Sequence, residues 1–153
     1  MKLDIGLGTH NNPDYTTVDL YLEADIQATM WKIPLPDKSV EEIFCKYALE
    51  HIPKSKVLPT LLEWKRLLTD NGEIIVQVPD MLWMCSYFLG APGRGRSMDY
   101  FYGGQSGEGD FHMTGFTIPI MEEWVYEAGL KIVKHDQYKE EDYMQDKFWI
   151  VKK

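Results

Sequence analysis

The sequence has few cysteines, no long apolar run and no excess of positive charge, and each shortage excludes a class of protein. Cys45 and Cys85, the two cysteines, form no C-x-x-C pair, so we expect two reduced structural thiols in a cytoplasmic protein. No apolar run approaches about 18 residues and no signal peptide precedes the first predicted strand, so we expect no membrane span. The net charge of −8 argues against a sequence-independent nucleic-acid binder, which needs a broad basic face.

What is present is the composition of one ordinary globular domain. The chain has 153 residues, of which 44% are hydrophobic and 26% charged. A chain of this length buries roughly 68–70% of its unfolded surface, which is enough for a real core. We therefore expect a single domain over residues 1–153.

Short apolar strands alternate with helical patterns along the chain. Apolar residues at positions 57, 58, 61, 62, 64, 67 and 68 follow the 3.6-residue period of a helix that faces a core. Further helices are expected over 81–89 and 118–128, the last with Thr117 as its N-cap and Gly129 at its end. Strands are expected at residues 2–5, 16–18, 24–26, 40–46, 73–78, 130–138 and 146–153, the last two as an antiparallel pair.

The start of the chain is similar to a nucleotide-binding loop but reaches its second strand early. The strand at 2–5 runs into Asp4-x-Gly6-x-Gly8, and the next strand ends on Asp19. In a dinucleotide-binding βαβ unit a helix intervenes and the acidic residue follows about 20 positions later. A crossover helix normally needs a dozen or more residues, so we expect that the helix between these two strands is absent.

Three segments together carry a resemblance to a known family: "LDIGLG", "VDLYLEAD" and residues 34–80, which include "YALEHIP" and the Asn-Gly turn before "EIIVQVPD". They resemble class I S-adenosylmethionine-dependent methyltransferases, and in particular a shortened subgroup. The resemblance implies an α/β fold with a Rossmann-like methyltransferase sheet. That sheet is mostly parallel with a C-terminal antiparallel hairpin, and the helical layer on one face is reduced.

The same resemblance implies S-adenosylmethionine as the cofactor and suggests which residues bind it. Asp4, Gly6 and Gly8 would line the methionine and ribose parts, and Asp19 would accept hydrogen bonds from both ribose hydroxyls. The remaining cofactor-binding candidates are Leu20, Thr29, Met30 and Tyr47.

Residues 90–117 form a segment rich in glycine and aromatics, and a loop of this length is usually a lid or a binding segment. We expect it to act as a substrate lid, with Tyr102, Phe111 and Arg94 as substrate-binding candidates. His112 and His51 are the catalytic candidates, because histidine accepts a proton near neutral pH. The alternative for residues 90–117 is a loop whose aromatic side chains only fill the edge of the sheet. The alternative for His51 is a structural histidine at a helix end. The four histidines, His10, His51, His112 and His135, lack ligand-pair spacing, so the sequence predicts no metal site.

The predicted function is methyl transfer to an oxygen or nitrogen of a small-molecule or sugar-like acceptor. One alternative is a non-catalytic cofactor-binding or partner subunit with the same fold. The other is a NAD-dependent oxidoreductase, which "GLGTHNNPDY" disfavours because it lacks G-x-G-x-x-G before a helix.

The missing helices also lead to an expectation about assembly. A parallel sheet is normally covered on both faces, and "EEIFCKY" and "EIIVQV" carry apolar residues on both sides. One face would then lack a cover from the same chain. We therefore expect a homodimer or a partner chain on that face, and no nucleic-acid or membrane partner.

Overall fold

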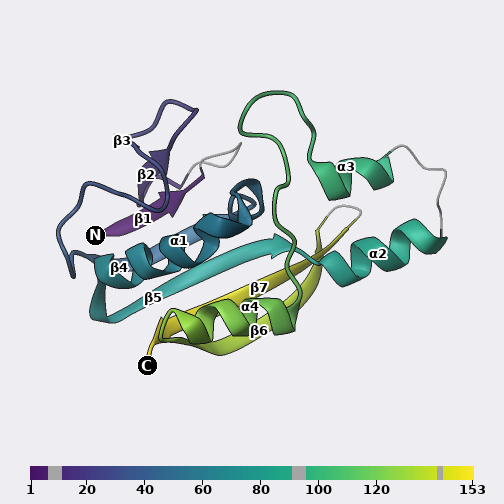
Figure 1. Ribbon diagram of the computed structural model, residues 1–153. Helices are drawn as coiled ribbons and strands as arrows, with labels where there is room; N and C mark the ends of the chain where they lie inside the picture. The colour runs from purple at the N-terminus through teal and green to yellow at the C-terminus, as the bar shows by residue number, and fades with distance from the viewer. Residues whose placement is uncertain (7–11, 91–95, 141–142) are drawn as a thin grey trace.

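The computed structural model describes residues 1–6, 12–90, 96–140 and 143–153, and Figure 1 traces the order of its elements. Strands dominate the first half of the chain, and most helices follow in the second half. The elements are, in chain order, β1 (Lys2–Ile5), β2 (Thr16–Asp19), β3 (Ile26–Gln27), β4 (Val40–Lys46), the 3₁₀ helix η1 (Leu49–His51), α1 (Lys54–Leu67), β5 (Leu68–Pro79), α2 (Met81–Gly90), α3 (Arg96–Tyr102), α4 (Ile118–Glu127), β6 (Leu130–Glu140) and β7 (Tyr143–Lys152).

The described strands form one sheet in the order β3-β2-β1-β4-β5-β7-β6. Neighbours from β3 to β5 run parallel, whereas β7 is antiparallel to both β5 and β6. The predicted fold class is confirmed: the sheet is mostly parallel and ends in an antiparallel hairpin. Because parallel strands end at a common edge, the segments after β1, β2, β4 and β5 meet there.

Helices α1 and α4 lie side by side on one face of this sheet (Figure 1). Trp64 of α1 and Met121 of α4 are fully buried against it. The strand side chains on the same face are all at most 1% exposed: Leu3, Ile5, Ile43, Cys45, Ile74, Val76, Phe148 and Ile150. This layer between the sheet and two helices is the hydrophobic core.

The ends of α4 agree with the sequence prediction, whereas the start of α1 does not. The Thr117 hydroxyl accepts a hydrogen bond from the amide of Ile120, and Gly129 has the left-handed φ of 68° that ends the helix. Helix α1 begins at Lys54, so Pro59 lies beyond its first turn at the cost of one helical hydrogen bond. Within the described ranges, no helix is both long and apolar enough to cross a membrane.

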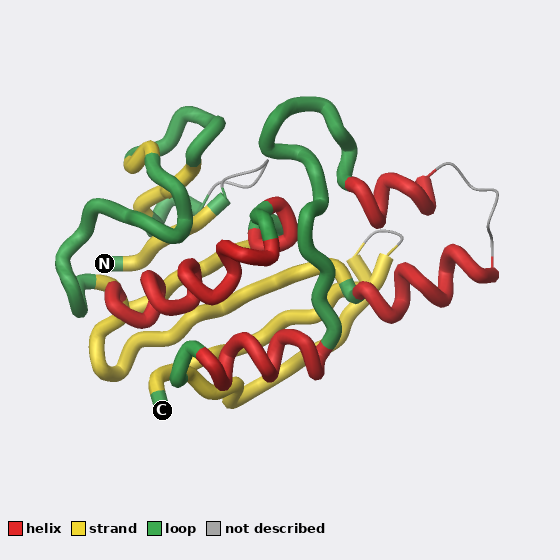
Figure 2. The backbone as a smooth tube through the Cα atoms, in the orientation of Figure 1, coloured by secondary structure: helices red, strands yellow, loops and turns green. Residues whose placement is uncertain are grey.

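Helices α2 and α3 project beyond the carboxyl edge of the sheet and do not cover a face (Figure 2). The helix predicted over residues 81–89 is therefore present, but it does not join α1 and α4 on the helical face. Met84 is buried, but Leu82 and Leu89 on the same helix are 67% and 79% exposed. Helix α2 contacts α3 and β7 instead, because the chain leaves β5 at the edge and turns outward.

The connection between β2 and β3 in the first half of the sheet needs no helix, because β3 is very short. Strand β3 pairs only with Val18 and Asp19 at the end of β2, so the connecting loop has to return by about 7 Å. Thr17 clips this loop: its amide and hydroxyl both donate to the Asp25 carboxylate, at 2.9 Å each. No helix lies between β1 and β4 in the described part of the chain, as the sequence predicted.

Helix α1 also holds the irregular connection from β3 to β4. The indole N–H of Trp64 donates to the carbonyl of Met30 at 3.1 Å, and the amide of Ile33 donates to Glu63 at 2.8 Å. Arg66 donates to the carbonyl of Leu35 at 2.9 Å. A loop that takes the place of a crossover helix is thus fastened to the core helix by side-chain hydrogen bonds.

The face opposite α1 and α4 is mixed in character and is not the apolar surface expected from the sequence. Phe44 and Trp149 are half-buried there, but lysine side chains lie over their rings. Lys134 Nζ is 4.0 Å from the Trp149 ring centroid, and Lys147 Nζ lies 5.1 Å from Trp149 and 5.7 Å from Phe44. Long lysine stems shield aromatic rings while their charge stays in water, which lowers the need for a covering layer.

Trp64 provides a stability test of this arrangement. Trp64→Ala removes a fully buried ring and should lower the free energy of unfolding by about 3–5 kcal/mol. Trp64→Phe keeps most of the ring but leaves the Met30 carbonyl without its donor, so we expect a loss of about 1 kcal/mol. Leu62→Ala, at a position that is 46% exposed on the same helix, should change stability by less than about 0.5 kcal/mol. Urea unfolding measures all three, and equal values for Trp64→Ala and Leu62→Ala would contradict this account of the core.

Candidate functional site

The loops after β1 and β4 are locked together at the carboxyl edge by Gly6. Gly6 has a left-handed φ of 80°, and a Cβ built on it would lie 2.1 Å from the Cβ of Ala48. Its amide also donates to the carbonyl of Val18 at 2.9 Å. The glycine is therefore required by close packing of the two loops, a reason that the motif alone did not reveal.

Asp19 lies at the end of β2, where the sequence places the ribose-binding carboxylate. Its Oδ1 accepts the amides of Tyr21 at 2.7 Å and Leu22 at 2.9 Å, so the following loop fixes the orientation of the carboxylate. Leu20 is 40% exposed beside it. An acidic side chain held rigidly at this edge fits a diol ligand, because the side chain loses no further freedom on binding.

The other candidates on the cofactor side are spread over the neighbouring strands. Asp4 is fully buried on β1, in register with Thr17 and Phe44. Thr29 and Met30 follow the end of β3, and Met30 packs against the core. These residues surround the first three strand ends, as the resemblance implies.

Tyr47 directly follows β4 and has an unusual backbone. Its φ of 54° is left-handed, and its amide donates to the carbonyl of Gln77 at 3.0 Å. Its hydroxyl accepts from Gln77 Nε2 at 2.8 Å. These hydrogen bonds tie the ends of β4 and β5 together just before η1, which carries Glu50 and His51.

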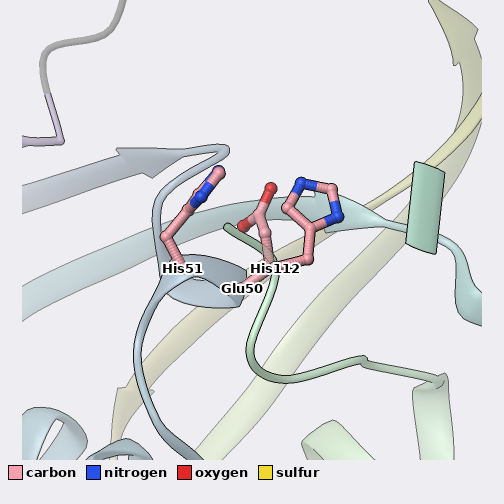
Figure 3. Close-up of side chains that lie close together, drawn as sticks. All are labelled: Glu50, His51 and His112. Atoms are coloured by element: carbon pink, nitrogen blue, oxygen red, sulfur yellow. The ribbon is translucent and has the colours of Figure 1, made fainter. Parts of the chain in front are cut away.

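Glu50, His51 and His112 form a cluster at the middle of the carboxyl edge (Figure 3). Glu50 and His51 come from η1, whereas His112 comes from the segment between α3 and α4. The two imidazole rings meet edge to face with centroids 4.8 Å apart, and the Glu50 carboxylate lies close to both rings (Figure 3). Residues that are 61 positions apart in the sequence thus face one another, which no local spacing indicated.

Glu50 is the most unusual member of this cluster. It is 2% exposed, and neither carboxylate oxygen has a hydrogen-bond partner among the described residues. Burial raises the pKa of its carboxyl to about 8. A buried, unpartnered carboxyl group destabilises a fold, so its presence points to function.

The two histidines are half-buried and are held by the backbone. His112 Nδ1 lies 2.9 Å from the carbonyl of Tyr100, which assigns the Nδ1–H tautomer and leaves Nε2 as an acceptor. Burial lowers the pKa of His112, and burial together with the neighbouring His112 lowers the pKa of His51. Both rings are therefore neutral imidazoles at neutral pH.

The segment from Gly103 to Thr117 is fastened over the cluster. The carbonyl of Glu50 accepts the amides of Met113 at 2.8 Å and Thr114 at 3.1 Å. The Thr114 hydroxyl donates to the carbonyl of Ile52 at 2.7 Å, and Phe116 bridges to Asp80. The segment crosses the edge in front of the strand ends, as Figure 2 shows.

Two adjoining hollows open beside the cluster, and both are lined by Glu50, Pro79, Tyr100 and His112. The first, of about 460 Å³, has an apolar wall that includes Met84, Phe101 and Phe116. The second, of about 570 Å³, extends to Tyr47, His51 and Tyr143.

The predicted substrate-binding residues are placed unevenly. Tyr102 and Phe111 are 53% and 40% exposed and are not among the residues that line the two hollows, so their role stays a prediction. Two other aromatic residues of the same segment do contribute: Tyr100 lines both hollows and Phe101 lines the first. Arg94 and Gly8 lie outside the described residues.

The sequence places Glu50 in the "YALEHIP" stretch after a predicted strand, but it did not indicate that this side chain is buried beside two histidines. The apolar neighbours Leu49 and Ile52 were the available signal, since they mark a turn that is packed inward. The four histidines are scattered along the sequence, but the fold brings His112 next to His51.

Comparisons with known proteins agree with the fold and the edge site. Residues 3–76 match the family described as "Methyltransferase domain". No curated protein sequence matches the chain.

Several solved structures share the fold at low sequence identity. A Methanosarcina mazei S-adenosylmethionine-dependent methyltransferase has a TM-score of 0.76 at 13% identity, over 99% of this chain and 91% of its own. The 1,6-didemethyltoxoflavin-N1-methyltransferase of Burkholderia thailandensis, solved with its substrate and S-adenosylhomocysteine, has a TM-score of 0.72 at 15% identity, over 99% and 70%. A chain from the Haloferax volcanii complex of the Trm112 methyltransferase activator with a putative methyltransferase has a TM-score of 0.66 at 14% identity, over 98% and 80%.

The matched domain, the sheet order and the position of the site lead to one conclusion. Residues 3–76 match the methyltransferase-domain family, and the chain as a whole has the fold of solved S-adenosylmethionine-dependent methyltransferases.

Proposed function

We propose that the chain transfers a methyl group from S-adenosylmethionine to an oxygen or nitrogen of a small-molecule or sugar-like acceptor bound beside Glu50, His51 and His112. The observation that carries this proposal is a cluster of one carboxyl group and two imidazoles beside two hollows at the carboxyl edge, the first of which has a mainly apolar wall. A hollow of this kind orients an acceptor through a few polar groups and excludes water around it.

The cofactor side of the proposal uses the first strand ends. Asp19 would accept the ribose hydroxyls and Leu20 would pack on the adenine, with Thr29 and Met30 beyond it. Gly6 and Tyr47 would adjoin the methionine end, and buried Asp4 would support the loop. The rigid Asp19 carboxylate and the tight Gly6–Ala48 contact support this arrangement, because both present backbone and carboxylate groups in fixed positions.

On the acceptor side, the chain mainly positions a nucleophile. When bound, the cofactor supplies a methyl group on a sulfonium, which is already a good leaving group. His51 and His112 present neutral imidazoles to the hollow, so they can hold the acceptor's O–H or N–H and take its proton. Their contact with each other and their closeness to Glu50 support this role (Figure 3).

The cofactor assignment is tested with Asp19→Asn. The amide keeps an oxygen for the Tyr21 and Leu22 amides but loses the charge that would accept ribose hydroxyls. We expect S-adenosylhomocysteine affinity to fall about tenfold or more, since hydrogen bonds to charged groups contribute about 1.5–3 kcal/mol each. Calorimetry measures this, with Asp14→Asn as an exposed control that should bind normally. Undiminished affinity of Asp19→Asn, or binding of NAD in place of S-adenosylhomocysteine, contradicts the assignment.

Residues 90–117 are part of the proposal as a substrate lid. The described part reaches from α3 across the cluster to Tyr21, whose ring would lie 2.7 Å from a Cβ built on Gly109. One segment therefore contacts both the loop after Asp19 and the acceptor hollow. This double contact supports a role in closing the site over the acceptor.

Two glycine variants test the lid. Gly109→Ala should push the segment off Tyr21 and lower turnover about tenfold, while S-adenosylhomocysteine affinity changes by less than about threefold. Gly107→Ala is the matched control, because a Cβ there meets nothing within 4 Å. Turnover is measured as labelled methyl transfer from S-adenosylmethionine to hydroxylated and amine small molecules, with the product identified by mass spectrometry. Equal turnover of the two variants reduces the segment to a packing role.

Assembly with a second chain through the face opposite α1 and α4 is a further part of the proposal. Half-buried Phe44 and Trp149, with lysine side chains over their rings, support a moderately polar interface. The similar chain in the Haloferax volcanii complex has a partner in its structure, which supports a partner chain as the alternative to a homodimer.

A reducing, cytoplasmic location is also proposed, supported by free Cys45 and the exposed free Cys85.

Light scattering tests the homodimer. We expect a dimer at tens of micromolar for the unchanged chain, and a monomer for Trp149→Ser, which removes the large ring from that face. Leu89→Ser, 79% exposed on α2, should leave the dimer intact. A monomeric unchanged chain at that concentration contradicts the homodimer.

A further inference from the structure

We propose that Glu50, His51 and His112 bind one divalent transition-metal ion of the zinc type. One carboxylate oxygen and one nitrogen from each ring lie within 4.8 Å of one another. Zinc–ligand bonds of about 2.0–2.2 Å bring ligand atoms to roughly 3–4 Å apart, so small side-chain rotations close the site. Two histidines and one carboxylate form a ligand set that recurs in metal sites with open positions.

The surroundings of Glu50 favour a cation over a structural role. The carboxylate is 2% exposed and has no hydrogen-bond partner among the described residues. The Glu50 carboxylate also has no ion-pair partner among the described residues, because every salt bridge found there involves a different acidic group. A metal ion would supply the positive charge and the ligand contacts that such a buried carboxylate needs.

The histidines are prepared to act as ligands. His112 Nδ1 is 2.9 Å from the Tyr100 carbonyl, so Nε2 keeps its lone pair on the side away from that bond. Metal-binding histidines commonly donate their second ring N–H to a backbone carbonyl in this way. Buried His51 Nδ1 has no hydrogen-bond partner in the described part of the chain. The cluster therefore offers unused donor atoms from all three side chains.

The ligand types select the class of metal. Mg²⁺ and Ca²⁺ prefer oxygen ligands, whereas imidazole nitrogens suit zinc and its neighbours in the first transition row. Methyl transfer needs no redox change, so a Lewis acid without redox chemistry is sufficient.

The position of the cluster says what the metal would do. Glu50 and His112 line both hollows, so an open coordination position would face a bound acceptor. This role rests on the proposed function: an acceptor hydroxyl on the metal loses its proton to solvent more readily, and its oxygen becomes the better nucleophile. The two histidines would then hold the metal, and the metal would acidify the acceptor.

Metal binding is tested without cofactor or acceptor, so that its failure is separate from failure of the proposed function. The full chain is stripped with a chelator and titrated with Zn²⁺ by calorimetry, and with Co²⁺ by visible absorption. We expect one ion per chain at micromolar or lower concentration, visible Co²⁺ bands, and no competition from millimolar Mg²⁺. Glu50→Gln and His112→Gln should each weaken Zn²⁺ binding by at least about tenfold.

Two controls make the result decisive. His135→Gln removes another histidine that contacts a carboxylate, Asp146 at 2.9 Å, and should leave Zn²⁺ binding unchanged. Glu50→Gln is nearly isosteric and removes a buried unpartnered carboxyl, so the metal-free variant should melt no lower than the unchanged chain. If Glu50→Gln fails to fold, His112→Gln carries the test alone.

Three outcomes overturn the proposal: no Zn²⁺ binding at tens of micromolar, unchanged affinity in both cluster variants, or loss of binding in His135→Gln. Normal S-adenosylhomocysteine binding and methyl transfer by the stripped chain would overturn the metal's catalytic role and leave the proposed function standing.

Discussion

Helix α1 is the constraint on which the rest of this structure depends. Its buried face, centred on Trp64, closes the core against the parallel strands, and its other contacts hold a loop that would otherwise need a helix of its own. Glu63 and Arg66 at its C-terminal end bind the backbone of residues 33–35. One helix therefore supplies both the hydrophobic cover and the hydrogen bonds that allow the first half of the sheet to be so short.

The candidate site depends on this rigid base. Because the ends of β1, β2 and β4 are fixed by the Gly6–Ala48 contact and by the Tyr47–Gln77 hydrogen bonds, η1 is held tightly enough to keep Glu50 buried. The carbonyl of Glu50 then anchors the segment that carries His112. The cluster is thus assembled by backbone hydrogen bonds, while its side chains keep their lone pairs for a ligand. Such an arrangement lowers stability locally and is typical of a functional site.

The uncovered face of the sheet shows how a single helical layer is tolerated. Successive side chains still point to alternate faces of the sheet, but those opposite the core include lysines whose stems cover Phe44 and Trp149. The lysine stems thus cover part of the apolar surface on that face, and a partner chain would cover the remainder. A reduced fold of this type can therefore keep the carboxyl edge of the larger methyltransferases without the helices that normally cover the second face.

The sequence by itself determined the order of the strands along the chain, the helices α1, α2 and α4, the antiparallel hairpin, the absent helices before β4 and the resemblance to methyltransferases, but it did not predict α3 within residues 90–117. Periodicity, caps such as Thr117 and the short spacing between Gly6 and Asp19 are local signals, and local signals decide element type. Part of the site was also visible, because Tyr47, Glu50 and His51 directly follow a predicted strand and so had to lie at its edge. Only the tertiary structure decided that His112 meets His51, that Glu50 is buried beside them, and that α2 leaves the sheet. These outcomes depend on where a long segment with few local preferences crosses the strand ends, and that path is set by distant contacts such as the Glu50 carbonyl with Met113 and Thr114.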